Sequence, residues 1–344
     1  MSEGCLFGIG NPLLDISAEV STDLLAKYKI KSNDAILAEE AHLPIYDELA
    51  ALPNVEYIAG GATQNAIRIA QWMLQIPGAT TYFGCVGADD YAEKMRAACG
   101  ADGVTVKYME HPEKPTGKCA VIVTGHDRSL VTDLQAASLY KLDHLKEAEN
   151  FAMVEKARFY YIAGFFLTSS PESIMTIAKH ACEYNKTFIM NLSAPFLMQA
   201  PPFKAALMEA MPYIDILFGN ETEAATFAET EGWDTKDVAE IAMRISKLPK
   251  QNGARVRTVV FTQGTDPTIV AVEGKIMQFN VTKLPKEAIV DTNAAGDAFV
   301  GGYLSQLVVG NSIAECARAG MYCAHLIIQR FGCTLPAKPE YIWA

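Results

Sequence analysis

One acidic residue stands among small residues in the stretch DTNAAGDAFVGGYL, residues 291–304. Asp297 follows two alanines and a glycine, and an apolar run typical of a helix begins at about the same point. The N–H groups at a helix start are unpaired and attract anions, and small side chains let a phosphate come close. A carboxylate beside that phosphate can accept a proton from an attacking hydroxyl. The stretch therefore predicts an anion site with a general base, ionised at neutral pH from an ordinary pKa of about 3.9, although a plain helix cap is the commoner use of such an acid.

Three further stretches place polar residues just after strand-like runs. GGATQN (60–65) leads a glycine pair into a helix that carries Asn65 near its start. GNETEAATF (219–227) puts Asn220 and Glu223 three residues apart, which places them on one helix face. FTQGTD (261–266) ends a strand in a turn. Taken singly, each stretch also fits an ordinary structural use: a strand-to-helix turn, solvated acids at a helix start, and a simple turn.

Several common catalytic motifs are excluded. PEKPTGKC has Pro112 where a phosphate-binding P-loop begins with glycine, and Cys119 where it ends in serine or threonine. GIGNPLLD begins like a dinucleotide-binding loop, but Pro12 and Leu13 stand where the third glycine and the helix entry belong. The chain has no G-x-S-x-G, and its six histidines form neither HExxH nor a close metal pair. Serine hydrolases, zinc hydrolases and ordinary dinucleotide enzymes are therefore disfavoured.

Composition restricts the partners and the compartment. The formal net charge is −11 and no basic stripe offsets it, so we expect neither nucleic acid nor a membrane as a partner. The eight cysteines form no C-x-x-C pair, which is typical of free thiols in a reducing compartment. We expect a cytoplasmic protein and leave the nucleus open. The opening MSEGCLFGIG has only a short apolar run, and it predicts neither export nor a membrane anchor.

Strand-like and helix-like runs alternate along most of the 344 residues. The strand-like runs lie at 5–10, 80–87, 159–167, 188–192, 216–220 and 258–264, and the main helix candidates at 63–75, 90–100, 171–184 and 236–248. This alternation predicts a parallel sheet covered by helices. Such a sheet would bring the polar residues at its strand ends to one edge.

Two regions break the alternation, at about 16–58 and about 113–136. Both contain short strand-like pieces with turn residues and no long helix, so we expect them to pair as a small sheet. That sheet would close as a lid over the edge where open α/β folds bind ligands. The predicted organisation is a large α/β domain of residues 1–15, 59–112 and 137–344, and a discontinuous lid of residues 16–58 and 113–136.

Five ordered motifs, GNPLLD, GGATQN, NETE, FTQG and DTNAAGDAF, together resemble those of the ribokinase-like family of sugar and nucleoside kinases. Within the family, GNPLLDI, AQWML, YYIAGFFLTSSPES, NLSAPF, DILFGNETEAATFA and DAFVGGYLSQLV are similar to members that phosphorylate adenosine, over essentially the whole chain. The resemblance implies a three-layer α/β/α domain with a central, mainly parallel sheet, and a small β-sheet lid. It also implies transfer of a phosphoryl group from ATP to the 5'-hydroxyl of adenosine with the help of Mg²⁺. We expect the protein to be a monomer. A monovalent cation is left open.

The resemblance assigns a role to each candidate residue. Asp297 becomes the general base, the N–H groups of Ala294, Ala295, Gly296 and Asp297 hold the transferring phosphoryl group, and Arg128 screens its charge from the lid. The residues expected to bind adenosine are Asn11, Asp15, Leu37, Gly61, Asn65, Cys119, Leu130, Leu134, Phe166 and Phe196, with Asp15 taking the ribose hydroxyls. Those expected around ATP are Asn220, Thr262, Gly264 and Asn293, with Glu223 holding Mg²⁺ through water. Without the resemblance, ordinary packing would explain the apolar positions, and solvation would explain Arg128.

Three positions depart from the family pattern. Ala294 stands where the family usually has glycine, Thr265 where relatives often carry arginine, and Ala35 where they often carry glutamine. A left-handed backbone at Ala294 would cost roughly 1–2 kcal/mol, so we expect a right-handed one. Two alternatives remain open: a kinase of the same family that acts on a sugar or on another nucleoside, and a non-catalytic nucleoside-binding protein on this scaffold.

Overall fold

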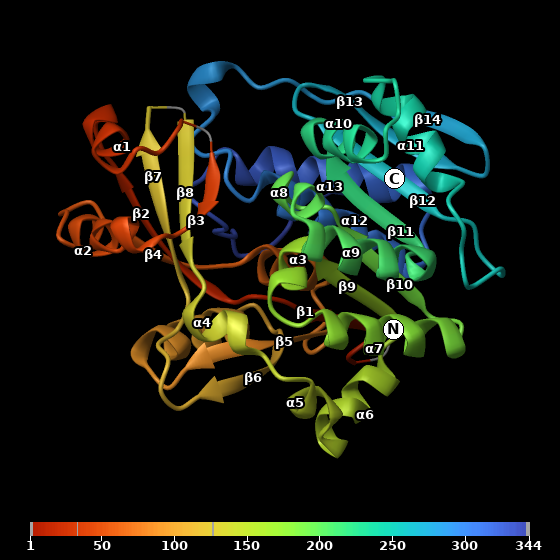
Figure 1. The fold of residues 1–344 in the computed structure, drawn as a ribbon, viewed down its shortest axis with the longest axis horizontal. Coiled ribbons are helices and arrows are strands. Elements are labelled where there is room, and N and C mark those ends of the chain that lie inside the picture. Colours follow the sequence, from red (N-terminus) through yellow and green to blue (C-terminus); the bar gives the residue numbers. More distant parts are fainter. Residues whose placement is uncertain (1–2, 33, 126, 342–344) are drawn as a thin grey trace.

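The computed structural model describes residues 3–32, 34–125 and 127–341, and a sheet of nine strands runs through the centre of this part of the chain (Figure 1). Its strand order is β14-β13-β12-β11-β10-β9-β1-β5-β6. The parallel strands are β1 (Leu6–Ile9), β5 (Thr80–Gly87), β6 (Thr105–His111), β9 (Phe159–Ala163), β10 (Thr187–Asn191), β11 (Ile216–Asn220) and β12 (Thr258–Gln263). At one edge, β13 (Asp266–Val272) and β14 (Lys275–Phe279) continue antiparallel. The parallel sheet predicted from the sequence is confirmed, and the antiparallel edge is an addition to it.

Helices cover both faces of this sheet, and each face has its own apolar core. One face packs against α3 (Ala62–Leu74), α4 (Asp90–Ala101), α12 (Ala295–Val309) and α13 (Ile313–Ile327). The other packs against α6 (Ala148–Lys156), α7 (Pro171–Glu183), α9 (Pro201–Ala210), α10 (Glu221–Thr230) and α11 (Val238–Ser246). Shorter helical pieces are α5 (Leu142–Lys146), α8 (Phe196–Gln199), η2 (Gln135–Leu139), η3 (Gly164–Thr168), η4 (Met211–Tyr213) and η5 (Lys286–Ala288). No helix in the described ranges has both the length and the apolar character needed to cross a membrane.

A second, five-stranded sheet stands beside the first, with the order β3-β8-β7-β2-β4 (Figure 1). Its strands are β2 (Leu13–Glu19), β3 (Ala35–Leu37), β4 (Glu56–Gly60), β7 (Lys118–Thr124) and β8 (Asp127–Asp133). One face packs on the short helices α1 (Thr22–Tyr28) and α2 (Pro44–Ala50), and η1 (Glu40–His42) lies between β3 and α2. The small sheet expected from the two irregular regions is thus present, and β2 and β4 run through the predicted boundaries at 15/16 and 58/59.

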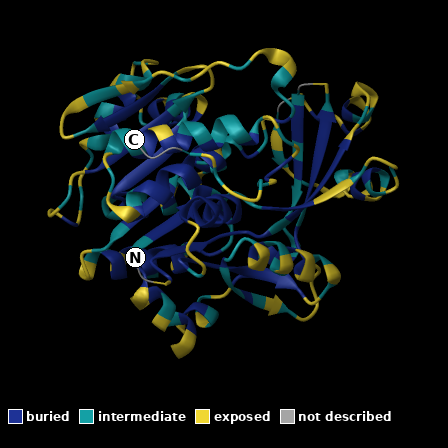
Figure 2. Cartoon of the chain, turned by 180° about the vertical axis from the view of Figure 1, so that it is seen from behind, coloured by how far each residue is buried: buried dark blue, intermediate teal, exposed yellow. Residues whose placement is uncertain are grey.

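Helix α12 is buried on all sides between α3 and α13 (Figure 2). Glycines make this packing close: a side chain at Gly301 would meet the carbonyl oxygen of Ala66 on α3 at 2.6 Å, and one at Gly302 would meet that of Ala319 on α13 at 2.4 Å. A helix that is apolar all round belongs in a protein interior. The neighbouring helices therefore fix the position of its first turn, where Asp297 lies.

Candidate active site

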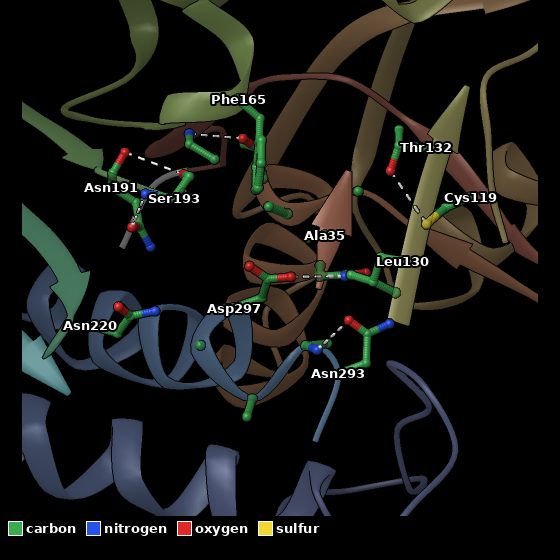
Figure 3. A pocket seen from close by; sticks show the side chains of 18 of the residues that line it. Ala35, Cys119, Leu130, Thr132, Phe165, Asn191, Ser193, Asn220, Asn293 and Asp297 are labelled. Atoms are coloured by element: carbon green, nitrogen blue, oxygen red, sulfur yellow. Dashed lines mark hydrogen bonds between the residues drawn. The ribbon is translucent and has the colours of Figure 1, made fainter. Parts of the chain in front are cut away.

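The carboxyl ends of the central strands and the second sheet enclose a cavity of about 740 Å³, a volume suited to a small organic ligand. Figure 3 shows residues of both sheets around it, with Cys119, Leu130 and Thr132 on the second sheet and Asp297 at the start of α12. The structure brings every candidate site residue from the sequence to this cavity: Asn11, Asp15, Leu37, Gly61, Asn65, Cys119, Arg128, Leu130, Leu134, Phe166, Phe196, Asn220, Glu223, Thr262, Gly264, Asn293, Ala294, Ala295, Gly296 and Asp297. Ala35 also lines it.

The first turn of α12 presents backbone donors to the cavity. Gly296 and Asp297 have no acceptor for their N–H groups among the described residues, as expected for a helix start. Two of the four donors predicted from the sequence are already engaged: the N–H of Ala294 donates to Oδ1 of Asn293 at 3.0 Å, and that of Ala295 donates to the carbonyl of Thr292 at 3.3 Å. The N–H groups left unpaired in this turn are therefore those of Gly296 and Asp297.

The prediction of a right-handed backbone at Ala294 is wrong. Its φ is 60° and its ψ is 5°, which is the left-handed region, and the residue caps α12. The side chain of Ala294 offsets part of the strain of this left-handed backbone, because it is buried in an apolar cluster that includes Ile69 and Met73 of α3. Burying a methyl group contributes about 0.8 kcal/mol, which offsets much of the roughly 1–2 kcal/mol of left-handed strain.

Burial changes the titration of Asp297. The loss of solvent raises the pKa of its carboxyl group to about 7, although Asn65 opposes this shift by donating its side-chain amide to Oδ2 at 3.0 Å. The expectation of a fully ionised Asp297 at neutral pH therefore needs correction, because the unliganded site holds a mixture of both forms. A carboxyl group that titrates near the working pH is well suited to accept and release a proton.

Asp15, on β2, is a second buried carboxyl group in the same cavity. Burial raises its pKa to about 8, and the negative charges of Asp297 and Asp291 add to that shift. The group lies against the backbone of Gly60 on β4, where a side-chain carbon would meet the carboxylate at 2.4 Å. Neither Asp15 nor Asp297 forms an ion pair with a described residue. Two unpaired carboxylates in one enclosed space are costly, so ligand donors would stabilise their charged forms.

Asn220 and Glu223 form a reciprocal cap at the start of α10. Asn220 donates its side-chain amide and its backbone N–H to the two oxygens of Glu223, at 2.9 and 3.0 Å, and its own Oδ1 accepts from the N–H of Glu223 at 2.8 Å. The carboxyl group is buried rather than solvated, and burial raises its pKa to about 7. This is a capping box, and both of its residues also line the cavity.

Arg128 reaches from β8 to the loop that precedes α12. Its Nε donates to Oδ1 of Asp291 at 3.1 Å, and the guanidinium also donates to the carbonyls of Val290 and Gly125. Both members of the ion pair are buried, so Arg128 is not the solvated surface residue that the alternative interpretation supposed. Asp291 further accepts from the N–H groups of Asn293 and Gly332, at 2.8 and 2.9 Å.

The far end of the cavity is mostly apolar. Of the apolar residues predicted to enclose the base, Phe166 is fully buried, whereas Leu37 on the short strand β3 is 40% exposed. The side chain of Asn11 is already engaged, because it donates to the carbonyl of Phe165 at 3.2 Å and accepts from Ser169 at 2.8 Å. Cys119 accepts a hydrogen bond from Thr132 at 3.4 Å, and burial raises the pKa of its thiol, which keeps the group neutral.

Sequence reasoning did not identify two residues that line the cavity, Asn191 at the end of β10 and Ser193 just after it (Figure 3). Oδ1 of Asn191 accepts from the N–H of Ser193 at 2.9 Å, and the Ser193 hydroxyl accepts from the N–H of Gly164 at 2.8 Å. Ser193 has a left-handed φ of 68°, which this bonding holds in place. The signal that identifies Asn191 is its place at the end of a strand-like run, because parallel strands share one carboxyl edge.

Replacing Asp297 with asparagine should stabilise the ligand-free protein at alkaline pH. A folded-state pKa of about 7, raised from 3.8 by burial, means that stability falls as pH rises from about 4 through 7. The melting temperature of Asp297→Asn at pH 8.5 should therefore exceed that of wild type by at least about 2 °C, and the difference should shrink toward pH 5. Calorimetry at pH 8.5 and at pH 5 checks this. Asp234→Asn, at an exposed position, is the control and should leave the melting temperature unchanged at both pH values. A difference that is the same at both pH values contradicts the burial argument.

Replacing Ala294 with glycine tests the strain at the start of α12. Relief of left-handed strain and loss of a buried methyl group oppose each other, so the free energy of unfolding should change by less than about 1 kcal/mol. Ala295→Gly, one residue later in the right-handed first turn, relieves no strain and should destabilise by about 1 kcal/mol. Urea titrations of both variants give the comparison. Equal destabilisation by the two glycines would show that Ala294 carries no strain.

Comparisons with known proteins point to one family. Residues 22–340 match the model described as pfkB family carbohydrate kinase. The chain is 58% identical to adenosine kinase 2 of Arabidopsis thaliana over 339 residues, which is 98% of both chains. It is 44% identical to the adenosine kinase of Dictyostelium discoideum, with 97% of each chain covered.

Solved structures agree with this assignment over the same length. Adenosine kinase of Anopheles gambiae in complex with P1,P4-di(adenosine-5) tetraphosphate superposes with a TM-score of 0.96 at 48% identity, covering 99% of this chain and 100% of that one. Adenosine kinase of Schistosoma mansoni in complex with 2-fluoroadenosine superposes with a TM-score of 0.95 at 38% identity, covering 99% of this chain and 100% of that one. The ribokinase-like architecture expected from the motifs is confirmed, and the chain belongs to the pfkB family of carbohydrate kinases.

Proposed function

We propose that the protein is an adenosine kinase, which transfers the γ-phosphoryl group of ATP to the 5'-hydroxyl of adenosine and releases AMP and ADP. The observation that carries the proposal is a cavity in which a helix N-terminus, the adjacent carboxyl group of Asp297 and a second carboxyl group, Asp15, meet beside an apolar end. Relatives named as adenosine kinases match nearly the full chain and support the same activity. The chemistry is that of a phosphotransferase with an alcohol group as acceptor.

The nucleoside would bind between the two sheets. Asp15 would accept hydrogen bonds from two ribose hydroxyls, since an ionised carboxylate has two acceptor oxygens. Gly61 and Asn65 lie beside it on the cavity wall and would complete the sugar site. The apolar end, with Leu37, Leu130, Leu134, Phe166 and Phe196, would enclose the flat base.

Phosphoryl transfer would take place at the first turn of α12. Asp297 would accept the proton of the 5'-hydroxyl as that oxygen attacks phosphorus, and the N–H groups of Gly296 and Asp297 would donate to the transferring phosphoryl group. Asn65 holds the carboxylate at its Oδ2 and would keep it directed toward the hydroxyl. Asn293, Thr262 and Gly264 also line the cavity and would contact ATP.

The residues present fit a magnesium ion bound mainly through water. Asn220 and Glu223 offer amide and carboxylate oxygens at the cavity wall, and Mg²⁺ in proteins keeps several waters beside few carboxylates. The described residues hold no group of three or more His, Cys, Asp or Glu side chains that forms a metal cage. When bound with ATP, the ion would supply positive charge to the phosphate oxygens.

The second sheet would act as a lid, with residues 16–58 and 113–136 moving relative to the rest. Arg128 joins this lid to the loop before α12 through Asp291, and its guanidinium would approach the phosphates when the lid closes. Closure would expel water and align the 5'-hydroxyl between Asp297 and the phosphate. We propose that the enzyme works as a monomer in the cytoplasm.

Side-by-side assays with adenosine, inosine, guanosine and ribose test the proposed activity. Adenosine should be the preferred acceptor with MgATP, because the apolar end of the cavity suits a flat base better than a bare sugar. Asp297→Asn should lower turnover by about a hundredfold or more while changing adenosine affinity by less than about tenfold. A preference for ribose points to a sugar kinase, and adenosine binding without AMP formation points to a non-catalytic binding protein.

Gly60→Ala should weaken nucleoside binding rather than chemistry. A methyl group at this position would overlap the carboxylate of Asp15 and displace it from the ribose site. We expect KM for adenosine to rise by about tenfold or more, with kcat at saturation reduced much less, because Asp297 is not moved. Gly100→Ala is the matched control, since a side chain there meets no atom within 4 Å. An unchanged KM for Gly60→Ala would mean that Asp15 does not hold the sugar.

A further inference from the structure

Gln64, the third residue of α3, is a buried polar side chain to which the proposed function assigns no part. Thr63 and Asn65, on either side of it, line the cavity, whereas Gln64 lies outside the lining and is fully buried. A buried amide group is costly unless its polar atoms have partners. The partners of Gln64 therefore show what it holds in place.

Both ends of the Gln64 amide are hydrogen-bonded. The nitrogen donates to the carbonyl oxygen of Gly60, the last residue of β4, at 2.7 Å, and lies 3.7 Å from the sulfur of Met95 on α4. The amide oxygen accepts from the hydroxyl of Tyr108 on β6. Because a backbone carbonyl can only accept, the nitrogen is the atom that faces Gly60. Gln64 thereby joins the end of a strand of the second sheet to an edge strand of the central sheet.

The backbone of Gly60 is the surface against which Asp15 lies. Strands β2 and β4 are antiparallel neighbours, with Leu13 of β2 opposite Gly60. A side-chain carbon on Gly60 would stand 2.4 Å from the carbon and from both oxygens of the Asp15 carboxyl group. A shift of this backbone would therefore move the wall behind the group that is proposed to hold the ribose.

Arg68, one turn further along α3, holds the residue before Gly60 in a similar way. Its guanidinium donates to the carbonyl oxygen of Ala59 at 3.0 Å and pairs with Asp102 at 2.6 Å. Residues four apart lie on one helix face, so Gln64 and Arg68 fix two successive peptides of β4 from the same side of α3. The end of β4 is thus held by side chains of the helix that also carries Asn65.

We propose that Gln64 is a positioning residue for the acceptor nucleoside, which keeps Asp15 aligned with the ribose by holding the backbone of Gly60. This inference rests on the proposed kinase function. Gln64 acts through the backbone from outside the cavity lining, and Asp297 keeps its own hydrogen bond from Asn65. Loss of Gln64 should therefore weaken adenosine binding more than it slows phosphoryl transfer.

Gln64→Met and Gln71→Met form a matched pair for testing this role. Gln71 is buried on the same helix, outside the cavity lining, and its amide is engaged in the same manner: it donates to the carbonyl of Ile76 at 2.6 Å and accepts from the hydroxyl and N–H of Thr80 at 3.0 Å. Methionine lacks a strong hydrogen-bonding group, so each substitution leaves buried partners unpaired and should lower the melting temperature.

Only Gln64→Met should change nucleoside binding. Calorimetric titration without ATP should give a Kd for adenosine about tenfold higher than that of wild type, and steady-state assays should give a similar rise in KM. We expect kcat and KM for MgATP to stay within about threefold. Gln71→Met should stay within about twofold of wild type in all four quantities.

Gln64→Glu separates a lost hydrogen bond from a disturbed core. A protonated carboxyl group can donate to Gly60 as the amide does, and burial raises the pKa of a glutamate, so Kd for adenosine at pH 6 should stay within about threefold of wild type. At pH 9 an ionised carboxylate would face the carbonyl oxygen of Gly60, so the ratio of this Kd to that of wild type should rise by about fivefold or more.

The other ionisable groups around position 64 do not account for such a rise. Burial raises the pKa values of Tyr108 on β6, Tyr82 on β5 and Cys99 on α4, which keeps all three groups neutral at pH 9. Arg68 of α3 stays charged beside Asp102. Asp15 on β2 titrates in wild type as well, so the ratio of the two Kd values corrects for it.

The outcomes separate the two proposals. Wild-type protein that binds adenosine but forms no AMP contradicts the proposed function and leaves the Kd comparison intact. Equal changes of Kd in Gln64→Met and Gln71→Met overturn the role of Gln64, because the loss then follows from the core. A Gln64→Glu variant that binds adenosine at pH 6 no better than Gln64→Met also overturns it. Should Gln64→Met fail to fold, Gln64→Glu is compared with Gln71→Glu, and a rise in Kd between pH 6 and pH 9 that is no larger for Gln64→Glu contradicts the role.

Discussion

The burial of two carboxyl groups in one cavity is the constraint on which the rest of the structure depends. Asp15 lies on β2 of the second sheet and is buried, Asp297 lies at the start of α12 and is partly buried, and neither has an ion pair among the described residues. Such groups raise one another's pKa and destabilise a folded chain when they ionise. The fold tolerates them because α3 and α13 hold α12 at glycine contacts that leave little freedom to move Asp297 into solvent.

Much of this site follows from the sequence because strand ends in a parallel sheet converge. Asn220 and Glu223 lie at the end of β11, and Thr262 lies near the end of β12, so their positions alone predict that they share an edge. Asn65 follows β4 of the second sheet and Asp297 follows a loop, so this rule does not place them. Asp15 could be placed only through the family resemblance, because it lies within a strand of the second sheet. Asn191 was missed, although the same rule of strand ends applies to it.

The backbone of Ala294 and the ionisation of Asp297 could not be predicted from local sequence. The local rule at Ala294 counts the strain of a left-handed alanine but not the methyl group buried against α3, more than 200 positions earlier in the chain. The reference pKa of Asp297 likewise ignores the helices and strands that exclude water from it. Both errors arise because the deciding energy comes from tertiary packing and not from neighbouring residues.

The two carboxyl groups also suggest how substrate would prepare the site. Ribose hydroxyls donating to Asp15 would stabilise its charged form, and that charge would then oppose ionisation of Asp297. The base therefore needs donors of its own to be negative when the substrate is bound. Asn65 provides one, and the N–H groups of the first turn of α12 provide a favourable field.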